Sequence, residues 1–213
     1  MTKALIIGAS GGIGAALAAA CAGHEVRALS RRDDGFDVTD PASVDRALGA
    51  LDGPFDLIIV AIGILGMPEK SLAAIDASAM AQVFAVNTIG PALILHHVPR
   101  LLGTSGKVAV LSARVGSIGD NRIGGWHSYR ASKAALNQII HGAAIELSRT
   151  HKDSICVALH PGTVATEFTA KYAGRHATVT PEEAASNLLS VIAALTPSQS
   201  GGFFDYSGAE VPW

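Results

Sequence analysis

Short apolar segments alternate with longer amphipathic segments along the chain. The short segments have the composition of β-strands, and they are residues 4–8, 25–29, 57–62, 107–112, 155–160 and 202–205. Residues 57–62 are apolar at every position, which indicates a strand covered by helices on both faces. Because helical patterns separate the strands, we expect a parallel sheet with crossover helices.

The helix boundaries support the same arrangement. Asp40 and Pro41 precede a predicted helix over residues 43–51, and Thr180 and Pro181 open another that ends near Thr196. Proline in the first helical turn is a typical start signal. The alternation runs from residue 3 to residue 205 without a repeat or a linker. We therefore expect an α/β fold with three αβα layers and a doubly wound sheet, in a single domain over residues 1–213.

Composition and charge exclude several classes of protein. Hydrophobic residues make up 49% of the chain and charged residues 16%, which excludes intrinsic disorder. The net charge is −2 and no basic run is present, so we expect no nucleic-acid partner. The apolar stretch over residues 57–67 is too short to span a bilayer and no secretory signal is visible, so we expect a cytoplasmic protein with no membrane partner. Cys21 and Cys156 are expected to be free, buried thiols.

A glycine-rich turn follows the first predicted strand. Gly8, Gly11, Gly12 and Gly14 lie between this strand and a helix that begins near Gly12. Glycine lets the backbone approach a pyrophosphate, whose charge is stabilised by the N–H groups at the start of the helix. Close packing of the strand on the helix would require the same glycines. The turn alone leaves both interpretations open.

Other motifs are weaker. Residues 8–12 fit the GxSxG nucleophile elbow of hydrolases, with Ser10 as the nucleophile, but only one strand precedes Ser10 and the hydrolase elbow follows several. Residues 103–108 lack the glycine spacing of a phosphate loop, and we expect a turn there. The eight histidines are scattered, and His96 and His97 diverge on a helix, so we expect no metal site. His160 is interpreted as structural.

Tyr129 and Lys133 are four residues apart in a predicted helix, which places both side chains on one face. A positive charge near a phenol favours the phenolate, so we expect Lys133 to lower the pKa of Tyr129. A tyrosine with such a pKa can exchange a proton with a carbonyl oxygen. A surface tyrosine packed on a lysine stem would give the same spacing.

These features occur together in the order found in short-chain dehydrogenases/reductases, and the chain resembles that family over nearly its whole length. Five segments are similar to family motifs: the glycine turn (8–14), the adenine-contacting DVTD (37–40), the central-helix asparagine (86–90), YxxSK (129–133) and PGxVxT (161–166). Residues 114–118, 124–126, 204–208 and 212–213 further resemble the C-factor-like and sniffer-like carbonyl reductases. The resemblance implies a Rossmann-like sheet of about seven strands.

The resemblance also implies the chemistry and the residues that perform it. Hydride would pass between a nicotinamide cofactor and a small carbonyl or alcohol substrate, while Tyr129 exchanges a proton with the substrate oxygen. Lys133 would hold the nicotinamide ribose, Ser112 would donate to the developing alkoxide, and Asn87 would bind a relay water. The implied cofactor-binding residues are Gly8, Ser10, Gly11, Gly12, Ile13, Gly14, Arg31, Arg32, Asp37, Val38, Ala61, Gly63, Tyr129, Lys133, Pro161, Gly162, Val164 and Thr166.

The sequence departs from the family pattern at several positions. Ile7 replaces the usual threonine, and residues 60–63 replace NNAG, which reduces polar bracing of the cofactor loop. Ser112 is followed by Ala113 where a serine pair is common, so Ser112 is the expected catalytic serine, with Ser117 as the alternative. The segment after Thr166 is short, so we expect a reduced substrate lid.

The choice of cofactor depends on the residues after the second strand. Asp33 or Asp34 could accept a hydrogen bond from the ribose 2′-hydroxyl of NAD, as expected about 20 residues beyond a glycine turn. Ser30 and Arg31 lie at the strand tip, where a guanidinium suits the 2′-phosphate of NADP. We predict NADP, with NAD as the alternative.

Two functions remain open at this point. The first is an NADP(H)-dependent carbonyl reductase, and the second is a cofactor-binding regulator that lacks turnover, which the missing second serine would favour. Trp126 and His127 either line the rim of the active site or pack structurally. The helices around Asn87 and Tyr129 are similar to the family's subunit-pairing bundle, so we expect a homodimer or homotetramer.

Overall fold

The core of the fold is a parallel sheet of six strands in the order β2-β1-β3-β4-β5-β6. The computed structural model describes residues 2–169 and 178–213. The strands are β1 (Lys3–Ile7), β2 (Glu25–Leu29), β3 (Phe55–Val60), β4 (Leu102–Leu111), β5 (Ile155–His160) and β6 (Phe203–Asp205). The order reverses between β1 and β3, as in doubly wound sheets. The expectation of about seven strands is wrong by one for the described residues, since the sequence contains only six strand-like apolar segments.

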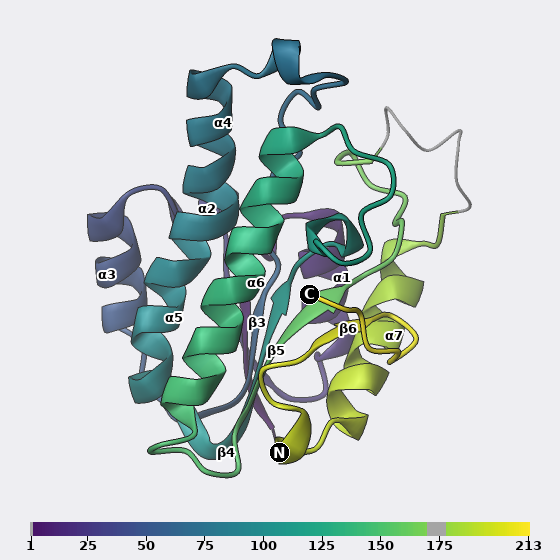
Figure 1. Cartoon of the computed structure of the whole chain (residues 1–213). Coiled ribbons are helices and arrows are strands. Elements are labelled where there is room, and N and C mark those ends of the chain that lie inside the picture. The colour runs from purple at the N-terminus through teal and green to yellow at the C-terminus, as the bar shows by residue number, and fades with distance from the viewer. Residues whose placement is uncertain (1, 170–177) are drawn as a thin grey trace.

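Helices cover both faces of the sheet and complete the three expected layers (Figure 1). The helices are α1 (Gly12–Ala20), α2 (Arg31–Asp34), α3 (Pro41–Gly49), α4 (Ala77–Phe84), α5 (Gly90–Leu101), α6 (His127–Leu147) and α7 (Pro181–Ala194). A π-helical turn, η2 (Ala85–Ile89), joins α4 to α5, and short 3₁₀ turns lie at η1 (Leu72–Ala74), η3 (Arg114–Gly116) and η5 (Pro197–Gln199).

Two apolar cores lie on the two faces of the sheet. On one face, α3, α5 and α6 pack on the strands and bury Val108 and Val110 of β4. On the other face, α1 and α7 pack on the strands and bury Ala109 and Leu111. Because side chains alternate along a strand, Ser112 continues the face that carries Val110 and α6. This alternation determines which polar groups at the end of β4 reach α6.

The stretch Ala77–Leu101 is long and apolar enough to cross a membrane by length and composition, with 25 residues and a mean hydropathy of 1.5. It comprises α4, η2 and α5. In the structure it packs between α3 and α6, and its buried residues, among them Ile94 and Val98, belong to the core on that face of the sheet. Its apolar character therefore matches its place in the core of the fold.

One local prediction differs from the structure. Residues 103–108, expected to form a turn, belong to β4; the register jumps from Phe55 opposite Leu102 to Leu57 opposite Lys107, so the strand bulges there. Leu102 and Lys107, at the two ends of this segment, pair with β3, whereas residues 103–106 between them have no partner on that strand. Local composition does not reveal these long-range pairings.

Candidate active site

The glycine turn packs tightly against the end of β3 and against α1. Gly8 has φ of +94°, and a Cβ on it would lie 2.4 Å from the carbonyl oxygen of Ala61. A Cβ on Gly14 would lie 2.1 Å from the carbonyl oxygen of Gly8. Both positions therefore exclude any side chain. These short distances support the close-packing interpretation of the glycines. Whether the turn can also bind an anion depends on the N–H groups at the start of α1.

The start of α1 presents open backbone donors. Gly11 is the N-cap residue, and no side chain caps the helix. Gly11 and Gly12 are exposed, and Ser10 and Ile13 beside them are half-buried. Uncapped N–H groups at a helix N-terminus suit the charge of a phosphate. The residues present therefore fit a dinucleotide at this turn.

Tyr129 and Lys133 are both buried in the first two turns of α6, with exposed fractions of 7% and 3%. The Lys133 ammonium donates to the carbonyl oxygen of Leu111, at the end of β4, with an N···O distance of 2.9 Å. Burial lowers the pKa of Lys133 to about 7. Burial also raises the pKa of Tyr129. The expectation that Lys133 lowers the Tyr129 pKa is wrong for this structure, because desolvation of the phenolate dominates.

Asn87 lies in the π-helical turn η2 and is fully buried. Its amide pairs with both backbone groups of Ile64: Oδ1 accepts from the N–H and Nδ2 donates to the carbonyl oxygen, each at 2.8 Å. Nδ2 also donates to the Ser132 hydroxyl at 3.1 Å. A Cβ on Gly63 would lie 3.4 Å from Asn87 Oδ1 and 3.5 Å from Lys133 Nζ. The predicted residues Asn87, Gly63 and Lys133 therefore converge, and the Asn87 side chain braces the loop after β3.

The serine expected to assist Tyr129 is engaged elsewhere in the structure. The Ser112 hydroxyl donates to Oδ1 of Asn137 on α6 at 2.6 Å. The alternative, Ser117, is buried and accepts from the N–H of Asp120 at 3.0 Å. Ala113, which follows Ser112, is also buried. A catalytic role for Ser112 stays a prediction, and it requires the Ser112 proton to leave Asn137.

The polar side chains after β2 differ in whether they form hydrogen bonds or ion pairs with other described residues. Ser30 is the N-cap of α2; its hydroxyl donates to Asp33 Oδ2 at 2.9 Å, and its N–H donates to Asp34 Oδ2 at 2.8 Å. Arg32 forms an ion pair with Asp33 at 2.9 Å. Within residues 2–169 and 178–213, the Arg31 guanidinium has no hydrogen bond or ion pair in the structure. The two carboxylates expected to favour NAD are thus partnered within the protein, while Arg31 is available.

Asp37 and Val38 organise the turn before α3. The Asp37 carboxylate accepts from the backbone N–H and the hydroxyl of Thr39, and these hydrogen bonds hold its pKa below the ordinary value. Val38 is buried against α5, where a Cβ on Gly90 would lie 2.3 Å from its Cγ2. Both residues are placed to shape one wall beside the end of β2.

The segment after β5 closes over the glycine turn. A Cβ on Gly12 would lie 2.6 Å from Cγ2 of Thr166, so Thr166 touches the start of α1. Val164 is buried and bridges to Val179. Gly162, which follows Pro161, has φ of +79° and packs under the ring of Tyr206. Part of the short lid expected after Thr166, residues 170–177, lies outside the described residues.

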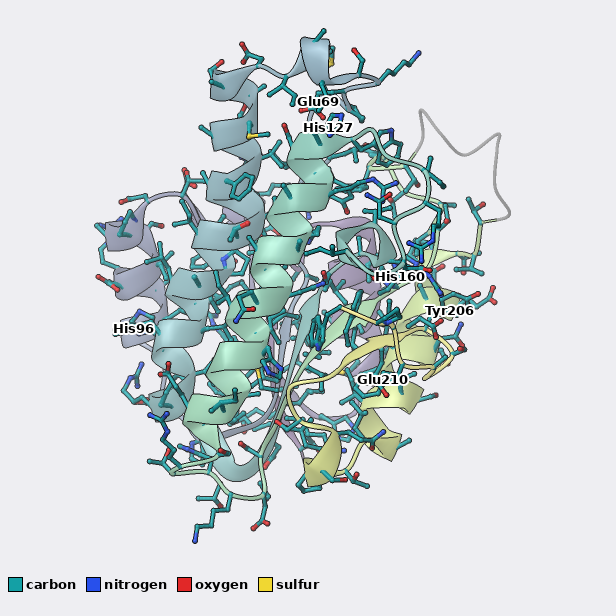
Figure 2. The ribbon with its side chains drawn as sticks, viewed as in Figure 1. Glu69, His96, His127, His160, Tyr206 and Glu210 are labelled. Carbon is teal, nitrogen blue, oxygen red and sulfur yellow. The ribbon has the colours of Figure 1, made fainter. Side chains whose placement is uncertain are left out.

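Two aromatic rings flank Tyr129. The Trp126 ring centroid lies 6.3 Å from that of Tyr129, and the Phe168 centroid lies 6.0 Å away. Trp126 adopts φ of +51°, which non-glycine residues seldom adopt, at the N-cap of α6. Figure 2 shows His127 beside Glu69 at the same end of α6. Of the two residues expected either at the rim or in packing, Trp126 contacts the tyrosine directly.

Sequence reasoning missed Glu69 and Asn137. Glu69 binds Ser128, which is 59 residues away in the sequence, and Asn137 accepts from Ser112, which is 25 residues away. Neither residue has a local spacing that indicates its partner. The sequence did contain a partial signal for Asn137. It lies one helical turn after Lys133, and therefore on the same helix face as Tyr129 and Lys133.

Comparison with known proteins agrees with this geometry. The family model described as enoyl-(acyl carrier protein) reductase matches residues 35–193. The chain is 36% identical over 185 residues to 1-hydroxy-2-glutathionyl-2-methyl-3-butene dehydrogenase of Rhodococcus sp. (strain AD45), covering 85% of this chain and 80% of that protein. It is also 36% identical over 169 residues to C-signal of Myxococcus xanthus, covering 78% of this chain and 98% of that protein.

Solved structures share the whole fold. The carbonyl reductase Sniffer of D. melanogaster is 21% identical, with a TM-score of 0.84 and full coverage (100%) of both chains. The NADPH-bound carbonyl reductase from chicken fatty liver is 24% identical, with a TM-score of 0.84, covering 100% of this chain and 99% of that one. The matched family model, the sequence relatives and the ordered motifs at the edge of the sheet agree: the chain belongs to the short-chain dehydrogenase/reductase family of oxidoreductases.

Proposed function

We propose that the protein is an NADP(H)-dependent carbonyl reductase that acts on small carbonyl or alcohol substrates, with Tyr129 as the general acid/base. One observation carries this proposal: Tyr129 and Lys133 are buried one helical turn apart, and a Cβ on Gly63 would lie 3.5 Å from Lys133 Nζ. A buried phenol on the same helix face as a buried amine can exchange a proton with a substrate, and the N–H groups at the start of α1 suit a dinucleotide phosphate.

The protonation states of the pair suit reduction. Because burial raises the pKa of Tyr129, the phenol is protonated at neutral pH and can donate its proton to a carbonyl oxygen. Lys133, with a pKa of about 7, exchanges protons readily near neutrality and is fixed by the carbonyl oxygen of Leu111. Bound NADPH would supply the hydride.

NADP fits the end of β2 better than NAD does. Asp33 and Asp34 are already hydrogen-bonded to Ser30, whereas Arg31 has no such partner among the described residues. A guanidinium can bind a 2′-phosphate through two parallel hydrogen bonds. The NADPH bound to the chicken carbonyl reductase is consistent with this choice. The glycine turn, Ala61, Gly63 and the segment 161–166 would hold the rest of the dinucleotide.

Apolar carbonyl compounds are the substrate class that the site favours. The rings of Trp126 and Phe168 flank Tyr129 on two sides, and Phe168 is 39% exposed. An aromatic wall next to the proton donor stabilises an apolar or aromatic group attached to the carbonyl carbon. Aryl aldehydes and aryl ketones are therefore the first substrates to examine.

We also propose a cytoplasmic homodimer or homotetramer. Both cysteines are free and buried, which is typical of proteins kept in a reducing compartment. Ile89 in η2 and Ile145 on α6 are 54% and 50% exposed, and both would become buried if the helices around Asn87 and Tyr129 paired two subunits.

A cofactor-binding regulator without turnover is the second candidate. It is favoured by one observation: the Ser112 proton is donated to Asn137, and the next residue is Ala113, so the oxygen of a substrate would lack one hydrogen-bond donor. Loss of such a donor lowers turnover by about 10²- to 10³-fold in other enzymes. One relative carries the name C-signal.

Oxidation of NADPH and NADH with a panel of aldehydes and ketones tests both candidates. The reductase predicts turnover of aryl carbonyl compounds with NADPH, and weaker turnover with NADH. Tight NADPH binding measured by fluorescence, together with no oxidation of NADPH on any carbonyl, would favour the regulator. Failure to bind either nucleotide would contradict both.

A further inference from the structure

Glu69 is a carboxylate in the loop after β3 that is only 7% exposed. Its backbone carbonyl oxygen accepts from the N–H of Trp126 at 2.6 Å. Its two carboxylate oxygens each lie 3.3 Å from the N–H of Ser128, and the Ser128 hydroxyl donates to Oε1. Glu69 therefore binds the backbone at the start of α6 at two positions, from a distant part of the chain.

These contacts take the place of a local helix cap. The N-cap residue Trp126 makes no side-chain cap hydrogen bond to the start of α6. The first N–H groups of a helix need acceptors, and a negative charge at this end is stabilised by the helix dipole. Burial by itself raises the pKa of Glu69, but hydrogen bonds from Ser128 and the nearby charge of His127 outweigh it, so the net pKa is below the ordinary value. Glu69 is therefore ionised at neutral pH and serves as the cap of α6.

The loop that carries Glu69 is fixed at its other end by Asn87. Asn87 pairs with the backbone of Ile64 and donates to the Ser132 hydroxyl. The Ser132 hydroxyl in turn donates to the carbonyl oxygen of Tyr129 at 2.8 Å. Residues 64–69 therefore join two attachments, one on each side of Tyr129 along α6.

We propose that Glu69 is a positioning residue for Tyr129: it caps the first turn of α6 and so fixes the phenol relative to the loop after β3, which carries Gly63. Its carbonyl oxygen accepts from the N–H of Trp126 and its carboxylate accepts from Ser128, so Glu69 acts on Tyr129 through the start of α6. The proposal rests on the proposed reductase function. It differs from a purely stabilising role because it predicts a loss in turnover by the folded protein.

The test compares Glu69→Ala with Asp76→Ala in the full chain. Asp76 is a matched control, because its carboxylate caps α4 through the N–H of Ala79 at 2.8 Å and the hydroxyl of Ser78 at 2.6 Å. For Glu69→Ala we expect kcat with an aryl aldehyde to fall about 10- to 100-fold, because small misplacements of a reacting group have effects of that size. We expect its dissociation constant for NADPH to stay within about twofold. Asp76→Ala should keep its kcat.

Glu69→Gln keeps one acceptor oxygen and should recover part of kcat, and Ser128→Ala should lose an intermediate amount. If Glu69→Ala does not fold, the kcat values of these two variants still test the proposal. Equal kcat values for Glu69→Gln, Ser128→Ala and the natural protein, measured well below their unfolding temperatures, would overturn the proposal. The same loss of kcat in Asp76→Ala would also overturn it.

Hydrogen exchange at the amides of residues 128–130 gives a readout that does not depend on turnover. We expect faster exchange there in Glu69→Gln and no change in Asp76→Ala. If the natural protein reduces no carbonyl compound, the proposed function fails, and the exchange result still shows whether Glu69 holds the start of α6. An unchanged exchange rate at these amides in Glu69→Gln would directly contradict the role of Glu69 as the cap of α6.

Discussion

Arg31 and Arg32 are neighbours in the single turn α2, directly after β2. Arg32 forms an ion pair with Asp33, whereas the Arg31 guanidinium forms no hydrogen bond or ion pair with the residues that the structure describes. We expect Arg31→Ala to raise the KM for NADPH about 10- to 100-fold, because a charge-assisted contact to a 2′-phosphate contributes about 1.5–3 kcal/mol. The KM for NADH should change little, since NADH has no 2′-phosphate. Initial rates with each nucleotide measure the effect. Arg27→Ala, within β2 itself, is the control, and an unchanged preference for NADPH in Arg31→Ala would contradict the assignment.

The end of β4 provides a second test at the residue scale. Ser112 donates its proton to Asn137, so a serine at position 113 would add a hydroxyl without disturbing that hydrogen bond. We expect Ala113→Ser to raise kcat about 10-fold or more, as a new donor to the developing alkoxide. The measurement is kcat with a saturating aryl aldehyde, with Ser112→Ala in parallel. A loss of about 10²-fold or more in Ser112→Ala, with no gain in Ala113→Ser, would instead assign the role to Ser112.

At the scale of elements, the π-helical turn η2 links α4 and α5 to the site. Asn87 makes three hydrogen bonds from this turn, two to Ile64 and one to Ser132. We expect Asn87→Ala to lower the free energy of unfolding by about 1–3 kcal/mol, because it leaves the half-buried backbone N–H and carbonyl groups of Ile64 without their partner. Urea denaturation measures the change. The exposed Asn121→Ala is the control, and equal losses in the two variants would contradict the role of Asn87.

Local sequence predicts a helix or strand correctly where its characteristic pattern of residues is uninterrupted. Strand β5 has the bounds expected from its apolar run, and α6 carries Tyr129 and Lys133 on one face as their spacing predicts. The bulge in β4 was not predictable, because it depends on the pairing of Leu102 and Lys107, on either side of residues 103–106, with β3. Tertiary contacts override local composition there.

The residues of the candidate site also fall into those that local sequence predicts and those that it does not. The glycine turn, the tyrosine–lysine pair and the segment 161–166 have characteristic local spacings and could be found in the sequence. The partners of Ser112 and Ser128 could not, because Asn137 and Glu69 reach them across the fold. The direction of the pKa shift of Tyr129 could not be predicted either. The residue spacing shows that Lys133 shares its helix face, but it does not show how deeply the phenol is buried.

At the scale of the whole molecule, buried His160 makes stability depend on pH. Burial lowers the pKa of His160 to about 4, although the charge of Asp205 opposes the shift. Between about pH 6.5 and about pH 4 the unfolded chain binds a proton that the folded protein does not, so the free energy of unfolding falls as the pH falls. The loss attributable to His160 reaches about 3 kcal/mol near pH 4.

Urea denaturation at pH 7 and at pH 4.5 measures this loss. His160→Leu removes the titrating group, and in the structure Nδ1 of His160 has no hydrogen-bond partner among the described residues. We expect the variant to lose less stability than the natural protein over this interval, since other acidic groups are common to both. An equal loss in the two proteins would show that His160 titrates normally.

The central claim is that the folded molecule brings a protonated phenol to a carbonyl oxygen beside bound NADPH. Steady-state turnover of an aryl aldehyde by the natural protein and by Tyr129→Phe tests it most directly, together with NADPH binding by fluorescence. We predict turnover by the natural protein, and a loss of about 10²- to 10⁴-fold in kcat for Tyr129→Phe with NADPH binding retained, because only the proton donor is removed. Comparable kcat values for the two proteins would contradict the claim.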